Sequence, residues 1–178
     1  PAELRLPVSE RTGPEGVLRA LDDPDALART VAEHEPEAVA VVLLHAYAHP
    51  EHERAIRAAL AEALPDVHVS LSHEVVGTFR EYERAATTEV DAALSPLLAA
   101  YLRRLVDRTG DEGLPTPAIM QSSGGLADIG VAADHAAFTV LSGPAGGAAA
   151  AALLAARREE PDLLCFDMGG TSCDVCVV

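Results

Sequence analysis

The residues best suited to chemistry gather at the end of the chain, in the segment LLCFDMGGTSCDVCVV at 163–178. Two apolar runs flank a polar turn, and this pattern is typical of a β-hairpin. Asp167 and Asp174 bring carboxylates to the turn, and residues 171–172 bring hydroxyls. The glycine pair at 169–170 lets backbone N–H groups approach an anion. The segment therefore predicts a turn that binds phosphate.

A metal ion is a natural companion of such a turn. Mg²⁺ combines few carboxylates with phosphate oxygens, so an aspartate at the end of a buried strand can hold it, usually through water. Asp167 is the predicted metal residue. The alternative is an ordinary tight hairpin in which Asp167 and Asp174 only cap turns. The local pattern favours these two interpretations about equally.

The cysteines suggest a second metal hypothesis, which is weaker. Cys173 and Cys176 have the spacing of a metal or redox pair. Residues three apart on a strand point to opposite faces, so the two thiols diverge there. We therefore expect the cysteines to be small buried hydrophobes.

Three histidines, His45, His49 and His52, also have suggestive spacing. Pro50 disfavours helical geometry at His49, so the three straddle a loop and a helix start rather than sharing one helix face. This disfavours a metal role. Ligands of α/β proteins bind at the carboxyl ends of parallel strands, so His45 remains a candidate for contact with a cleft.

Helical and strand patterns alternate in the first part of the chain. Asp23 and Pro24 open a helix as a capping acid and a first-turn proline. Residues 38–44 form a continuous apolar run, typical of a strand buried on both faces, and residues 67–71 alternate like a strand. Pro50 opens the helix between them. This order predicts an α/β fold with a parallel-rich sheet flanked by helices.

For two helices in this region the sequence predicts which side is buried and which faces solvent. In the helix after Pro50, Ile56 and Leu60 share the apolar face and Glu53 is expected to face solvent. A long helical stretch at 81–109 follows, with Pro96 inside it, which predicts a kink or two abutting helices. Its apolar positions recur at helical spacing; they are Val90, Leu94, Leu97, Leu98, Tyr101, Leu102 and Leu105. The charged run at 80–84 is expected to be a solvated, salt-bridged face.

Two glycine-rich segments complete the pattern. A short strand at 117–121 runs into Ser122-Ser123-Gly124-Gly125, a candidate ligand loop that is a weak signal alone. Farther on, Ser142 is placed to cap a helix and Pro144 suits its first turn. Gly146 and Gly147 lack bulk, so another segment can lie directly against this helix.

Composition narrows the class of protein. The 178 residues suffice for one domain or two small lobes, and with 3% aromatics and no Trp the core must be built of Ala, Leu and Val. A formal net charge of −15 argues against nucleic acid or an anionic membrane as a partner. Three cysteines and the lack of an apolar leader favour a cytoplasmic protein.

Four motifs carry a family resemblance. They read SLSHEVVGTFREYERAATT, IMQSSGG, LSGPAGGAAAA and CFDMGGTSCDV. In this order and spacing, over roughly residues 38–178, the chain resembles the hydantoinase A/5-oxoprolinase family. The resemblance implies the actin/Hsp70/sugar-kinase ATPase superfamily, whose two ribonuclease-H-like lobes surround a nucleotide cleft. We expect an internal fragment, incomplete at both ends: 1–141 in the first lobe, 142–160 as the lobe-connecting helix, and 161–178 as the first hairpin of the second lobe.

The resemblance also implies an activity. Such proteins use ATP and Mg²⁺ to phosphorylate the oxygen of a cyclic amide, for example a hydantoin or 5-oxoproline, before water opens the ring, commonly with a B-type partner subunit. Here Asp167 is expected to hold the metal and Asp174 to orient metal or water. The expected phosphate and cleft residues are Gly169, Gly170, Thr171, Ser172, Ser122, Gly124 and Gly125. Glu83 and Arg84 are looser candidates for structure or substrate contact.

Two alternatives stay open beside this hydrolase. A related acetone- or acetophenone-type carboxylase subunit shares the motifs, and the chain by itself is also compatible with an inactive structural or partner-binding piece. Departures from the family pattern at Cys173, Ser123 and Asp91, where Thr, Asn and Asn are usual, leave the fold expectation unchanged and the substrate undefined.

Overall fold

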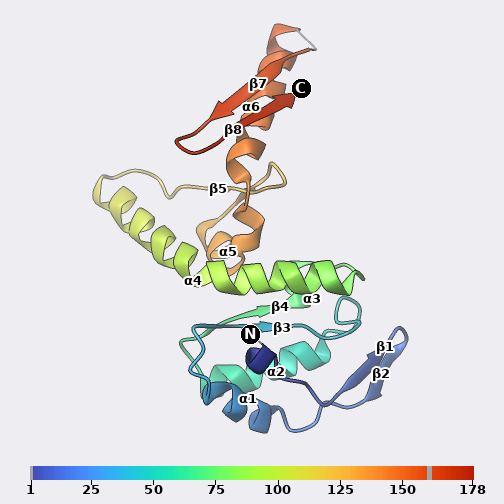
Figure 1. The fold of residues 1–178 in the computed structure, drawn as a ribbon. Helices are drawn as coiled ribbons and strands as arrows, with labels where there is room; N and C mark the ends of the chain where they lie inside the picture. Colours follow the sequence, from blue (N-terminus) through green and yellow to red (C-terminus); the bar gives the residue numbers. More distant parts are fainter. Residues whose placement is uncertain (1, 160–161) are drawn as a thin grey trace. The chain divides into compact units, whose positions relative to one another are not determined.

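A computed structural model describes residues 2–159 and 162–178, and the chain forms two compact units, Pro1–Ala100 and Tyr101–Val178 (Figure 1). The boundary between 160 and 161 that the sequence predicts therefore lies outside the described residues. Among the described helices, none is long and apolar enough to cross a membrane.

The first unit contains the predicted α/β alternation. Helix α1 (Pro24–Ala32) precedes strand β3 (Ala38–Val41), and helix α2 (Glu51–Ala63) precedes strand β4 (His68–Leu71). The two strands pair in parallel, from Ala38 opposite His68 to Val41 opposite Leu71. The parallel pairing confirms the prediction, but β3 ends three residues earlier than the apolar run 38–44 suggests.

Local signals at the helix starts are confirmed. Asp23 caps α1, because its Oδ1 accepts a hydrogen bond of 2.8 Å from the N–H of Ala26. The helix α2 begins directly after Pro50. Its apolar face is buried as expected, since Ile56 and Leu60 belong to the core that α2 shares with β3 and β4. These starts depend on neighbouring residues, so the sequence is sufficient to predict them.

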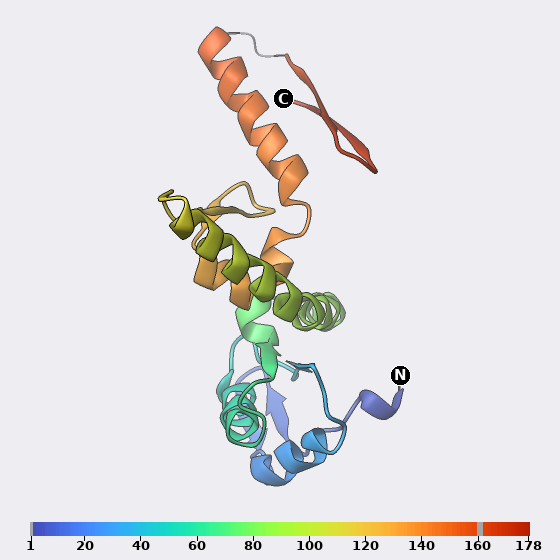
Figure 2. The same cartoon turned by 90° about the vertical axis from the view of Figure 1, so that its left-hand side faces the viewer.

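Helices lie on both faces of this parallel pair. Figures 1 and 2 show α1 and α2 on one side and the first part of α4 (Glu81–Asp111) on the other. The short helix α3 (Ser72–Val75) follows β4 directly. The first unit is thus a small three-layer α/β/α arrangement, in which the loops after β3 and β4 leave the same end of the sheet.

A β-hairpin that the sequence pattern does not predict precedes α1. Strands β1 (Arg11–Gly13) and β2 (Gly16–Arg19) pair antiparallel after a short 3₁₀ turn, η1 (Ala2–Leu4). His52 of α2 reaches this region, where its Nδ1–H donates to Glu10 Oε2 at 2.8 Å. His52 therefore serves a structural contact.

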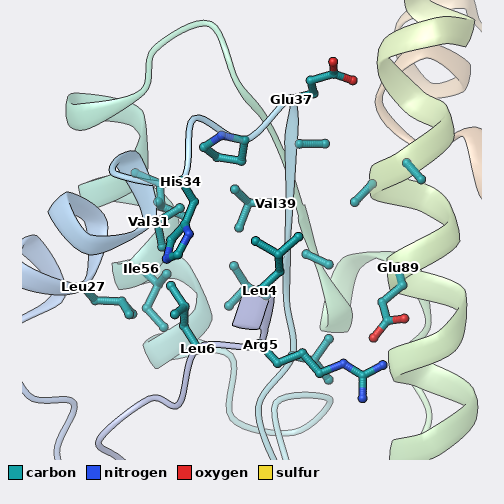
Figure 3. A pocket seen from close by; sticks show the side chains of 18 of the residues that line it. Leu4, Arg5, Leu6, Leu27, Val31, His34, Glu37, Val39, Ile56 and Glu89 are labelled. Atoms are coloured by element: carbon teal, nitrogen blue, oxygen red, sulfur yellow. The ribbon is translucent and has the colours of Figure 1, made fainter. Parts of the chain in front are cut away.

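A cavity of about 1050 Å³ lies in the first unit beside β3. Figure 3 shows aliphatic side chains from three elements around it, including Leu27 and Val31 of α1, Val39 of β3 and Ile56 of α2. Its lining is mainly apolar, with charged or titratable side chains such as Arg5, His34 and Glu89 among the residues around it.

The face that α4 buries differs from the predicted one in its first part. The apolar positions Val90, Leu94 and Leu97 are exposed, Leu97 at 71%, whereas Leu102 of the same predicted set is buried. The side that turns toward the sheet is polar and fully buried; it comprises Arg84, Thr88, Asp91 and Ser95. The predicted solvated run 80–84 is therefore wrong at Arg84. The helix stays continuous through Pro96 and includes Gly110, where the sequence predicted its end.

The second unit consists of short strands and helices around one long helix. Its elements are β5 (Ile119–Met120), β6 (Leu126–Ala127), α5 (Ile129–Asp134), η2 (Ala136–Thr139), α6 (Ser142–Arg158), β7 (Leu164–Met168) and β8 (Cys173–Val177). Asp128 caps α5 through the N–H of Val131 at 2.9 Å. The predicted helix at 142 is confirmed, although it begins at Ser142 with Leu141 as the cap residue, so Ser142 does not cap it.

The predicted parallel-rich sheet is only partly present. Within the described ranges, β3–β4 is the one parallel pair; the pairs β1–β2, β5–β6 and β7–β8 are antiparallel. The architecture is mixed α/β and mostly helical. An apolar run predicts a strand but does not say how many other strands pair with it. The sequence patterns therefore overestimated the number of parallel strands in the sheet.

Candidate active site at the β7–β8 hairpin

The predicted chemical segment forms the hairpin that its pattern indicates. β7 and β8 pair from Leu164 opposite Val177 to Met168 opposite Cys173. In this register Asp167 lies directly opposite Asp174. Paired residues of an antiparallel ladder share one face, so the two carboxylates stand side by side. Like charges in that position destabilise a hairpin unless a cation lies close to them.

Glycines of α6 make room for one of these carboxylates. A Cβ atom at Gly147 would lie 3.7 Å from Asp167 Oδ2, and a Cβ atom at Gly143 would lie 3.9 Å from the same oxygen. Asp167 therefore lies over the first turns of α6, beside the positive end of the helix dipole, which favours a negative charge. The expectation that a segment packs directly on Gly147 is confirmed.

The same helix also contacts the strand that leads to the second glycine-rich loop. A Cβ atom at Gly146 would lie 3.7 Å from Cγ of Met120 in β5. The glycine face of α6 therefore brings β5 and β7 to one helix. These two strands carry the SSGG and DMGGTS segments that the sequence singled out separately.

The tip of the hairpin is open. The N–H of Gly169 donates to the carbonyl of Ser172 at 3.0 Å and closes the turn. Neither Gly169 nor Gly170 is among the described residues with left-handed backbone, and nothing lies within 4 Å of a Cβ built at Gly170. Backbone conformation therefore does not require glycine at Gly170, whereas the close approach of an external group would.

These features fit a magnesium phosphate. Two adjacent carboxylates match the oxygen ligands that Mg²⁺ prefers, and an open glycine turn with neighbouring hydroxyls matches phosphate oxygens. Asp167 would hold such an ion, with Asp174 opposite it in the hairpin and Thr171 and Ser172 in the turn. When bound, the ion would neutralise charge on the phosphates.

The SSGG loop has a structural task in this unit. Ser122 donates its N–H to the carbonyl of Phe138 at 2.7 Å, and its hydroxyl donates to the carbonyls of Phe138 and Val140. Gly124 adopts a left-handed conformation, φ 84°, in the β5–β6 turn, and the carbonyl of Gly125 accepts from Gln121 N–H. Ser122 therefore holds the segment that leads into α6, and its role toward a ligand stays a prediction.

The cysteine prediction needs correction. Cys165 and Cys176 are half-buried cross-strand partners, but Cys173 is exposed, so it is not a buried hydrophobe. Burial raises the pKa of the Cys165 thiol, and the adjacent Cys176 and the Asp167 carboxylate raise that pKa further. A raised thiol pKa is the opposite of what a reactive or metal-binding cysteine needs.

The first unit contains a buried charged network that the residue pattern misses. Glu53 and Arg84 are both fully buried, and the hydroxyl of Ser72 joins them. That hydroxyl donates to Glu53 Oε1 at 2.6 Å and accepts from Arg84 Nε at 3.1 Å. The predicted outward Glu53 is therefore wrong. No local signal marks Glu53, while Arg84 lies in the EYERAATT motif.

Comparison with known families and proteins identifies the chain. The profile of the hydantoinase/oxoprolinase family matches residues 84–178, more than half of the sequence. The chain belongs to the hydantoinase/oxoprolinase family. This confirms the resemblance that the four motifs predict.

Two relatives of this hydantoinase/oxoprolinase chain show how far the similarity extends. Caprolactamase subunit alpha of Pseudomonas jessenii is 34% identical over 98% of this chain, which covers 26% of that protein. 5-Oxoprolinase 1 of Arabidopsis thaliana is 41% identical over 77% of this chain, covering 11% of that protein. The chain thus spans about a quarter or less of the length of these relatives.

Solved structures agree with this assignment. The crystal structure of the ATP-dependent caprolactamase from Pseudomonas jessenii matches 99% of the chain with a TM-score of 0.86 at 34% identity, and the chain covers 26% of it. The nucleotide-free structure of acetone carboxylase, an enzyme of ATP-dependent acetone carboxylation, matches 96% with a TM-score of 0.81 at 28% identity, and the chain covers 25% of it. Members of the family thus include both ATP-dependent amide hydrolases and carboxylases.

Proposed function

We propose that this chain is part of an ATP-dependent enzyme that activates a cyclic amide by phosphoryl transfer before the ring opens. ATP is the phosphoryl donor, the amide oxygen is the acceptor, and water then attacks the activated carbon. The observation that carries the proposal is the pairing of Asp167 with Asp174 at an open glycine turn. In phosphoryl transfer, catalysis is mainly positioning and charge neutralisation, which such a turn supplies.

Each feature of the hairpin then has a role in the proposal. Asp167 holds Mg²⁺, and Asp174 orients the ion or a water molecule. Gly170, Thr171 and Ser172 contact phosphate oxygens, while Gly169 shapes the turn. The segment 1–141 belongs to a first lobe, 142–160 connects the lobes, and 161–178 opens the second. Ser122, Gly124 and Gly125 line the cleft as well as supporting the helix α6.

Relatives named for cyclic amides support amide chemistry as the first candidate. The caprolactamase subunit and the plant 5-oxoprolinase are 34% and 41% identical to the chain, while carboxylase relatives are 31% and 28% identical. A carboxylase subunit remains the second candidate, because the acetone carboxylase structure also matches nearly the whole chain. A B-type partner subunit fits either candidate, since caprolactamase is named as having subunits.

Nucleotide titration tests the proposal directly. Calorimetry with Mg·ATP and Mg·ADP would use the 178-residue chain beside the full gene product with its co-purifying subunits. We expect the full protein to bind, and Asp167→Asn and Asp174→Asn to weaken Mg·ATP binding at least tenfold. Asp162→Asn is the matched control, since Asp162 is an exposed acid just before β7.

Substrate assays separate the candidates. The full protein should release phosphate from ATP in the presence of caprolactam, 5-oxoproline or hydantoin and open the ring. Acetone-dependent uptake of labelled bicarbonate without amide turnover would instead identify a carboxylase. Absence of Mg·ATP binding by the full protein would refute both and leave the hairpin as a structural element.

A further inference from the structure

The turn that leaves β3 is held on both sides by buried charges. The N–H of Leu43 donates to Glu53 Oε1 at 2.9 Å, and the carbonyl of Leu43 accepts from Arg84 at 2.8 Å. Both charged side chains are fully buried. The two peptide groups that flank the Leu43 Cα are thus fixed by Glu53 from α2 and by Arg84 from α4. We call Glu53, Ser72 and Arg84 the clasp.

The clasp also holds the loop after β4. Arg84 donates to the carbonyl of Thr78 at 2.7 Å, and Glu53 accepts from the backbone and the Nδ1 of His73, the latter at 2.7 Å. Both loops that leave the carboxyl end of the parallel pair are therefore tied to the same two buried side chains, Glu53 and Arg84, which the Ser72 hydroxyl links. Buried charges with this many partners fix geometry more than they add stability.

The loop after Leu43 presents a small set of side chains. Leu44 is 40% exposed and Tyr47 is 36% exposed. His45 adopts a left-handed backbone, φ 57°, and its Nδ1 is buried with no hydrogen-bond partner in the described part of the chain. The Tyr47 ring lies 5.6 Å from the Arg84 guanidinium and 6.1 Å from the His45 ring. The clasp therefore orients Tyr47 as well as the backbone.

From these contacts we propose that the loop 44–48 contacts the ring of the amide substrate and that Glu53 and Arg84 are its positioning residues. This rests on the proposed function. A cyclic amide is a small neutral ring with one N–H, one carbonyl and apolar methylene groups. Leu44 and the Tyr47 ring offer exposed apolar surface that fits the methylene groups, and the His45 Nδ1, unpaired within the described ranges, is buried in the same loop. The loop lies at the carboxyl end of a parallel strand, where α/β proteins bind ligands.

Tyr47→Ala tests the contact in the full gene product with its subunits. We expect the KM for the amide to rise about tenfold, the size of effect that loss of one apolar contact gives, while the affinity for Mg·ATP is unchanged. Tyr47→Phe should retain most of the wild-type KM. Tyr82→Ala is the matched control, because Tyr82 is 83% exposed in the same unit and outside the loop.

Arg84→Lys tests the positioning role, because lysine keeps the charge but cannot reach the three acceptors together. We expect kcat/KM for the amide to fall by about 100-fold, as displacement of a positioning group does, with faster amide hydrogen exchange at 43–48. Arg80→Lys, four residues earlier and exposed, is the control.

The outcomes separate this inference from the proposed function. If the wild-type protein hydrolyses ATP only with an amide present, and Tyr47→Ala leaves the amide KM unchanged, the loop does not contact the substrate and the inference is refuted. If Arg84→Lys speeds hydrogen exchange without changing kcat/KM, the clasp is only structural and its positioning role is refuted. If the wild-type protein binds no Mg·ATP, the proposed function fails first.

Discussion

Arg84→Met should be among the most destabilising single substitutions in the first unit. The change removes the donor of three hydrogen bonds, to Leu43 O, Thr78 O and Ser72 Oγ, at a side chain with no exposed surface. Each buried acceptor left unpaired costs about 1–3 kcal/mol. Glu53 keeps its own hydrogen bonds, from Leu43 N–H and His73, so the loss falls on the three acceptors of Arg84.

The three losses overlap because the freed acceptors can partly relax, so we expect the free energy of unfolding to fall by about 3–5 kcal/mol in total. Urea unfolding, followed by far-UV circular dichroism and tyrosine fluorescence, measures this loss. With an m-value of about 2 kcal/mol/M, the midpoint should fall by about 2 M. The Tyr47 ring lies beside the Arg84 guanidinium, so fluorescence reports on the same region.

A matched substitution four residues away isolates the effect of burial. Arg80 is exposed, and its ion pair with Glu83, from Nη1 to Oε1 at 3.4 Å, is also exposed to solvent. Arg80→Met should therefore change the free energy of unfolding by no more than about 0.5 kcal/mol. A loss below about 1 kcal/mol for Arg84→Met would show that the guanidinium lies in water, and the reasoning on the clasp would be wrong.

Two further predictions concern the second unit. Gly147→Ala should stabilise the chain by about 0.5–1 kcal/mol in thermal unfolding, because a Cβ there meets Asp167 only at ordinary contact distance and alanine favours the helix. Gly147→Leu should instead destabilise the chain, because its larger side chain displaces β7. Equal effects of the two substitutions would contradict the packing of β7 on α6. Cys165 should react with iodoacetamide at pH 8 more slowly than exposed Cys173, as read by peptide mass spectrometry, and Asp167→Asn should speed the Cys165 reaction because it removes a charge that raises the thiol pKa. Equal rates at both cysteines would contradict that.

The sequence alone determined the elements whose signals are local. The capping Asp23, the proline start of α2 and the hairpin around Gly169-Gly170 were all predictable, since each depends on residues within a few positions of one another. The four motifs were likewise enough to indicate the family. The opposition of Asp167 and Asp174 then follows from the hairpin register alone.

Only the tertiary structure decided which charged residues are buried and what supports the site. Glu53 and Arg84 have the pattern of surface residues, and their burial depends on Ser72, 19 positions from Glu53, and on Leu43, 41 positions from Arg84. The packing of the Asp167 side chain against Gly143 and Gly147 likewise depends on the tertiary contact between β7 and α6. A hydrophobic pattern reports the period of an element but not its partner. A charge can be buried only where distant groups complete its hydrogen bonds, so the fold, rather than the local sequence, decides where that occurs.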